Sequence, residues 1–126
     1  MGQQQLLLIV LGVIVVGIAV VVGINLFNAN AVSSNRDGVV SDLNNLGAMA
    51  QQFYKKPTSM GGGGNTFTGW ALPAELDTTA NGNYAITVAA QTVTINGYGT
   101  EDAEDGNNIH HRAAVGPTTI VVTKIN

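Results

Sequence analysis

The feature that most constrains this chain is an unbroken apolar run near its N-terminus. The run extends from Leu6 to Ile24, and none of its 19 residues has a polar side chain. As an α-helix with a rise of about 1.5 Å per residue it would be about 28 Å long, close to the hydrocarbon thickness of a bilayer. A strand is excluded, because strands usually have fewer than ten residues. The run is therefore predicted to be a helix that faces lipid or other protein on every side.

The distribution of charge limits the roles that this apolar helix can have. The chain has five basic and eight acidic residues, yet the first charged residue is Arg36. A cleaved secretory signal fits poorly, because its start is basic and a small-residue cleavage site follows its apolar region. Single-pass anchors usually have Lys or Arg near one end of the span. The uncharged stretch favours a segment that finally packs among other helices, where a lone charge would be costly.

Residues 28–56 continue the helical pattern but become amphipathic, and Pro57 is expected to end the helix. The apolar spacing of four and three residues from Val39 onward is typical of a helix that buries one narrow face. The residues predicted to pack that face on a sheet are Val39, Leu43, Leu46, Ala50 and Phe53. The opposite, solvent-facing side is predicted to include Asn30, Ser34, Asp37, Asp42, Asn45, Gln52 and Lys55.

The C-terminal part of the chain is predicted to form a small antiparallel meander. Alternating polar and apolar residues, separated by turn residues, predict strands. The expected strands are 84–89, 91–95, 109–115 and 118–125, with 96–99 ending the second. Because this meander has no second layer of its own, the helix face from Val39 to Phe53 is its natural cover. The predicted fold is α+β, with an apolar helix in residues 1–27 and an amphipathic helix plus sheet in 28–126.

Few residues suggest a metal-binding or other ligand-binding site. The acidic stretch 101–108 offers weak calcium candidates in Asp102, Glu104 and Asp105, although a solvated loop is the more common role of such a stretch. His110 and His111 are adjacent, so in a strand they point to opposite faces and cannot chelate one ion together. The four glycines 61–64 lack the Lys and Ser/Thr of a phosphate-binding loop and are expected to be a connector.

Composition excludes further classes of function. The chain has no cysteine, so disulfides and thiolate chemistry are ruled out. The net charge is −3 and no basic cluster is present, which argues against a nucleic-acid partner. No catalytic or cofactor-binding motif is found, so no cofactor and no enzymatic activity are expected.

The layout resembles the type IV pilin and pseudopilin superfamily. Members have a long N-terminal helix whose apolar half forms a filament core and whose amphipathic half packs on a small antiparallel sheet. Gly2 followed by Gln3-Gln4-Gln5 resembles the junction at which family members are processed, and Leu7 stands where a glutamate is typical. No basic residue precedes that junction in the sequence.

The resemblance implies a structural subunit of an extracellular filament on the cell surface. Its partners would be copies of itself, the membrane before assembly, and the inner-membrane assembly machinery with a prepilin peptidase acting at Gly2 and Gln3. The residues expected in the filament core are Leu6, Leu7, Leu8, Ile9, Val10, Leu11, Val13, Ile14, Val16, Ile18, Val20, Val21, Ile24 and Phe27. The alternative is a membrane-anchored extracytoplasmic binding module, either an adhesin or a calcium-dependent binder.

Overall fold

A computed structural model describes residues 2–103 and 105–126, which fall into two compact units. The first unit ends at Ala31, and the second comprises Val32–Asn126. Helix α1 extends from Gly2 to Lys55, so the single long helix is confirmed, and it ends two residues before Pro57 as predicted. The remaining elements are the short 3-10 helix η1 (Thr58–Met60) and five strands.

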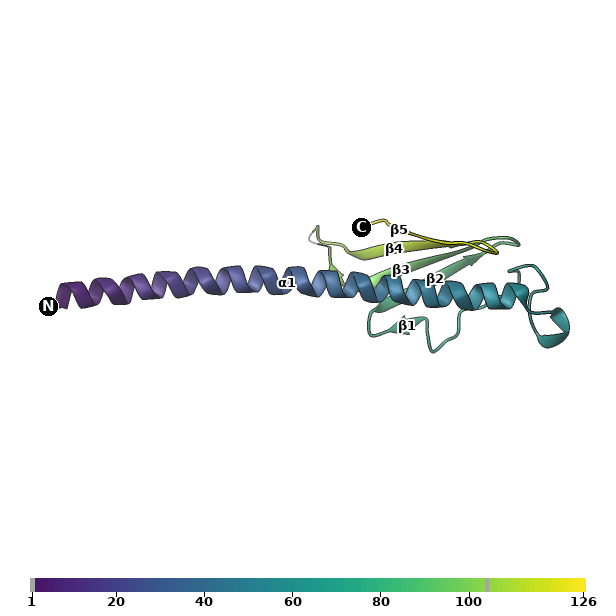
Figure 1. Cartoon of the computed structure of the whole chain (residues 1–126), viewed down its shortest axis with the longest axis horizontal. Helices are drawn as coiled ribbons and strands as arrows, with labels where there is room; N and C mark the ends of the chain where they lie inside the picture. Colours follow the sequence, from purple (N-terminus) through teal and green to yellow (C-terminus); the bar gives the residue numbers. More distant parts are fainter. Residues whose placement is uncertain (1, 104) are drawn as a thin grey trace. The chain divides into compact units, whose positions relative to one another are not determined.

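The strands form one antiparallel sheet in the order β1-β2-β3-β4-β5, in which sequence neighbours pair (Figure 1). Their bounds are Thr78–Thr79, Gly82–Val88, Val93–Asp102, Asn108–Val115 and Ile120–Lys124. The predicted meander is thereby confirmed, with the two-residue strand β1 added at one edge.

Strand β3 corrects one prediction, because it continues through residues 96–99 instead of ending there. The two glycines in this stretch are not turn residues. They lie on the buried face of the sheet, where a Cβ at Gly97 would lie 3.0 Å from Val39 Cγ1 and 3.0 Å from Tyr84 Cε1. Glycine here lets α1 approach the sheet closely. The strand becomes irregular only between Tyr98 and Asp102, where its register with β4 shifts.

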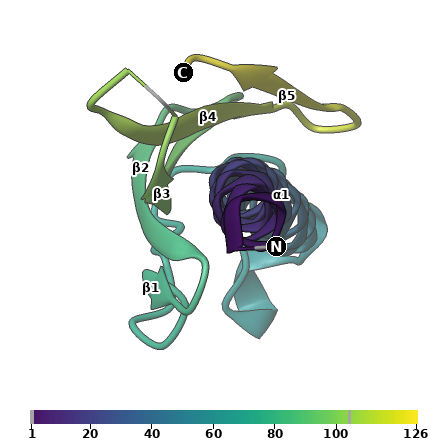
Figure 2. The same ribbon diagram turned by 90° about the vertical axis from the view of Figure 1, so that its left-hand side faces the viewer.

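One face of the sheet packs against the second half of α1, and Figure 2 shows the strands curving around one side of the helix there. Val39, Leu43, Leu46 and Ala50 are at most 2% exposed, whereas Phe53 is half-buried at the edge of the same core. Four of the five predicted packing residues are therefore central and the fifth is peripheral. The sheet contributes Tyr84, Val93, Ile95, Ala113 and Val115 to this core. Phe67 and Trp70, from the segment before β1, are also buried in it.

The glycine loop after η1 is more ordered than a simple connector. Gly63, Gly64 and Asn65 donate backbone hydrogen bonds of 2.8–3.0 Å to the carbonyl oxygens of Phe53, Lys56 and Tyr54. Carbonyls in the last turn of a helix have no partner within the helix, so the loop caps them. The result is an α+β arrangement like that of a pilin, with a long N-terminal helix packed on a five-stranded antiparallel sheet.

Candidate assembly surface

Most of the exposed large apolar side chains of the described chain lie in the first unit, between Leu6 and Phe27. All fourteen residues predicted for the filament core are between 52% and 74% exposed, and Val15, Val22 and Leu26 are similarly exposed. Each Leu, Ile, Val or Phe gains about 1.5–3 kcal/mol when it is moved from water into an apolar environment. A contiguous apolar surface of this size marks a site for a membrane or for other protein. We call the exposed side chains of residues 6–27 the apolar sleeve.

The helix that bears the apolar sleeve is long and apolar enough to cross a membrane, and none of its most apolar window is buried. Three glycines interrupt it. Apart from the neighbouring backbone of α1 itself, a Cβ added at Gly12, Gly17 or Gly23 would meet no described atom of the chain within 4 Å. Nothing inside the described chain therefore requires glycine at these positions, which suits close approach by the backbone of another helix. Gly2 and Gln3, the residues predicted at the processing junction, form the start of α1.

In the second unit, Asp42 is a polar anchor between helix and sheet. Its Oδ2 accepts hydrogen bonds from Tyr84 OH at 2.6 Å, Thr79 Oγ1 at 2.8 Å and Asn81 Nδ2 at 3.0 Å. Partial burial raises the pKa of the Asp42 carboxyl, but these three hydrogen bonds outweigh burial and hold the pKa below its usual value. Asp42 was predicted on the polar face opposite the packing residues, and it is half-buried there, because side chains of the β1–β2 region bond to it.

Asn35 is a second anchor that sequence reasoning missed. Its Oδ1 accepts from the backbone N–H groups of Thr100 and Glu101, and its Nδ2 donates to the carbonyl of Asn81 at 2.7 Å. Only 8% of the residue is exposed. Asn35 precedes Val39 by four residues, so the helical period that identified Val39 and Leu43 also places Asn35 on the buried face.

The two histidines lie on opposite faces of β4, as predicted. His111 is 6% exposed, and its Nε2 lies 3.4 Å from Nη1 of Arg36, which also donates to the main-chain oxygen of Asn126 at 2.8 Å. On the other face His110 stacks on Tyr98, with ring centroids 4.3 Å apart. In residues 2–103 and 105–126, no group of three or more acidic or histidine side chains is arranged to hold a metal ion.

The described residues of the acidic stretch 101–108 lie at the end of β3, in the connection to β4 and at the start of β4. Asp102 Oδ1 accepts from the N–H of Gly106 at 3.0 Å, and Asp105 Oδ1 accepts from the N–H of Asn107 at 3.0 Å. Both carboxylates therefore stabilise the turn itself. The third calcium candidate, Glu104, lies outside the described residues, and calcium binding here stays a prediction.

Comparison of the chain with protein-family models, with curated proteins and with solved structures gives no significant match. Any inference about function therefore rests on the fold and on the apolar sleeve.

Proposed function

We propose that this protein is the structural subunit of an extracellular, type IV pilus-like filament on the cell surface. The observation that carries the proposal is the apolar sleeve, which belongs to the same helix that packs on the sheet. The sleeve is exposed on all sides, and no charged residue occurs before Arg36. A helix bundle buried inside a fibre satisfies both properties at once, because it removes the apolar side chains from water without burying a charge.

In this proposal the partners of the chain are other copies of itself. The sleeve of each subunit packs on the sleeves of its neighbours, while the second units stay at the outside of the fibre. Before assembly the sleeve lies in the membrane, where its length matches the hydrocarbon layer. By the resemblance to pilins, a prepilin peptidase would act at Gly2 and Gln3, and an inner-membrane machinery would assemble the fibre. The subunit itself would have no catalytic site and no cofactor.

The test is electron microscopy of material sheared from cells, with the protein identified by mass spectrometry. The unmodified chain should form long fibres. Val16→Lys places a charge within the sleeve. Burying that charge among apolar helices costs on the order of a few kcal/mol, so the variant should abolish fibres. Thr87→Lys makes the same change of charge at an exposed position of β2 and should leave fibres intact. Normal fibres from Val16→Lys, or no fibres from the unmodified chain, would refute the proposal.

The second candidate is a membrane-anchored binding module, which is favoured by the suitability of α1 for crossing a membrane. An anchored module would stay with washed membranes and would be missing from the sheared fraction. The same experiment therefore separates the two functions.

A further inference from the structure

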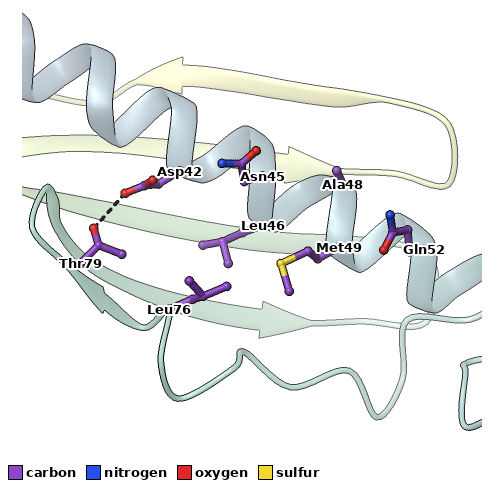
Figure 3. Close-up of a pocket in the computed structure, with 8 residues that line it drawn as sticks. All are labelled: Asp42, Asn45, Leu46, Ala48, Met49, Gln52, Leu76 and Thr79. Carbon is purple, nitrogen blue, oxygen red and sulfur yellow. Dashed lines mark hydrogen bonds between the residues drawn. The ribbon is translucent and has the colours of Figure 1, made fainter.

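A hollow of about 400 Å³ opens within the second unit, beside the C-terminal third of α1. Its apolar lining consists of Leu46, Ala48, Met49 and Leu76, and its polar lining consists of Asp42, Asn45, Gln52 and Thr79. Figure 3 shows Leu46, Met49 and Leu76 gathered between α1 and the segment before β1, with the bonded pair Asp42 and Thr79 at one end and Gln52 at the other. We call this hollow the α1 pocket.

The α1 pocket combines an apolar floor with a polar rim on which Asp42 is the one charged residue among the described residues that line it. All three side-chain hydrogen bonds that Asp42 accepts from described residues end on Oδ2. The other carboxylate oxygen, Oδ1, therefore keeps its capacity to accept a hydrogen bond. An occupant that suits this lining has an apolar side chain and carries positive charge beside it.

The chain itself presents such a group just after the C-terminal end of α1. Met60 is 65% exposed, more than any other large apolar side chain described in Val32–Asn126. Lys55 and Lys56, both exposed, precede it in the sequence. Met is unbranched and polarizable, so it adapts its shape to an irregular apolar hollow.

Met60 is held on a structured turn. Its N–H donates to the carbonyl of Pro57 at 3.0 Å, and the N–H of Gly61 donates to the carbonyl of Thr58 at 3.1 Å. Gly61 then reverses the chain with a φ of 84°. Ordering an interface costs conformational entropy, and a side chain presented on a formed turn avoids much of that cost. We call Met60 with Lys55 and Lys56 the η1 knob.

We infer that the α1 pocket of one subunit receives the η1 knob of a second copy of this chain, with Met60 on the apolar floor and a lysine beside Asp42. The inference rests on the proposed filament and names a contact between its outer units. The knob and the pocket are made of different residues of one chain, and a contact in which each pocket receives the knob of the next copy in line is heterologous. A heterologous contact that does not close into a ring continues as a helical fibre, which is the assembly that the sleeve also requires.

Cross-linking of the full chain in assembled fibres tests this contact, because the chain has no cysteine of its own to react. Ala48→Cys places a thiol in the pocket, and Ser59→Cys places one beside Met60 without removing it. A short bismaleimide applied to fibres of the double variant should give a ladder of covalent multimers on a denaturing gel. Each single variant should give no ladder. The control pair of Ser59→Cys with Thr87→Cys, at an exposed position of β2, should also give none.

A matched pair of substitutions tests the energetic part of the contact. Met60→Asp should lower the yield of fibres by about tenfold, the scale expected from losing the burial of one methionine. Val121→Asp introduces the same carboxylate at a side chain that is 57% exposed and should leave the yield unchanged. The contact would be overturned if intact fibres gave no ladder, or if the control pair gave an equal ladder. It would also be overturned if the two Asp variants gave equal yields of fibres. Any of these results would assign the pocket another occupant. No fibres from the unmodified chain would overturn the filament and this contact with it.

Discussion

The hydroxyl of Tyr84 donates a hydrogen bond to Oδ2 of Asp42 over 2.6 Å, and so joins strand β2 to the C-terminal third of helix α1. Burial and this carboxylate both raise the pKa of Tyr84, so the phenol stays protonated and remains a donor. Thr79 and Asn81 donate to the same oxygen. One carboxylate oxygen thus fixes three positions of the β1–β2 region against the helix.

Removing that acceptor should destabilise the second unit. Asp42→Ala leaves three donors without their partner, and we expect a loss of about 1–3 kcal/mol in the free energy of unfolding. Asp37→Ala removes an exposed carboxylate from the same helix and should change that free energy by less than about 0.5 kcal/mol. Urea unfolding of the whole chain in mild detergent measures both variants. Equal stability of the two would show that the Asp42 network contributes nothing.

The buried His111 should make stability depend on pH. Burial lowers its pKa, and the neighbouring charges of Arg36, Lys124 and His110 lower it further. His110, on the other face, also has a lowered pKa, because of burial and then Arg112. A folded-state pKa below the unfolded value means that the unfolded chain binds more protons. The stability is therefore fully present above about pH 6.5 and should fall as the pH drops from there towards the folded-state pKa.

Thermal unfolding between pH 7.5 and 5 tests this dependence. The unmodified chain should unfold at lower temperature as the pH falls. His111→Gln, which cannot take up a proton in this range, should flatten the profile. An identical slope in both proteins would locate the pH dependence elsewhere, with His110→Gln as the next comparison.

Replacing Gly97 with alanine should destabilise the second unit, even though alanine is normally the better strand residue. A Cβ there would lie 3.0 Å from Val39 Cγ1 and 3.0 Å from Tyr84 Cε1, and both side chains belong to the packed core. We expect Gly97→Ala to lower the free energy of unfolding by about 1–3 kcal/mol, the usual range for overpacking. The added Cβ of Gly12→Ala meets no described atom within 4 Å apart from the neighbouring backbone of α1, so this variant should not destabilise the detergent-solubilised monomer. A neutral Gly97→Ala would mean that α1 does not approach β3 as closely as described.

A chain that begins at Asn28 should be soluble and monomeric, because it lacks the apolar sleeve but keeps the second unit, which begins at Val32. Circular dichroism should show both helix and strand, and sedimentation should give the mass of one copy. Aggregation or a disordered spectrum would contradict the independence of the second unit.

Much of this fold could be predicted from the sequence, because its main signals are long. An apolar run from Leu6 to Ile24 and a regular spacing from Val39 to Phe53 each extend over several helical turns. The positions of polar anchors were harder to predict. Asp42 looks like a surface residue in the helical pattern, and only the chain folding back at Thr79 and Asn81 partly buries it. Gly97 looks like a turn residue until the helix is placed over it. The α1 pocket likewise depends on Leu76, whose place beside Leu46 no local pattern reveals.

Whether packing of the apolar sleeves holds the fibre together is tested most directly by measuring the length of fibres in 2 M sodium chloride and in a mild detergent. If packing of the apolar sleeves holds the fibre together, fibres should survive the salt, which screens exposed ion pairs beyond about 2 Å, and should dissolve in the detergent. Charged contacts such as the η1 knob with Asp42 would then set the register of subunits without supplying most of the stability. Fibres that dissolve in salt and resist detergent would contradict the account and indicate a polar assembly of the second units.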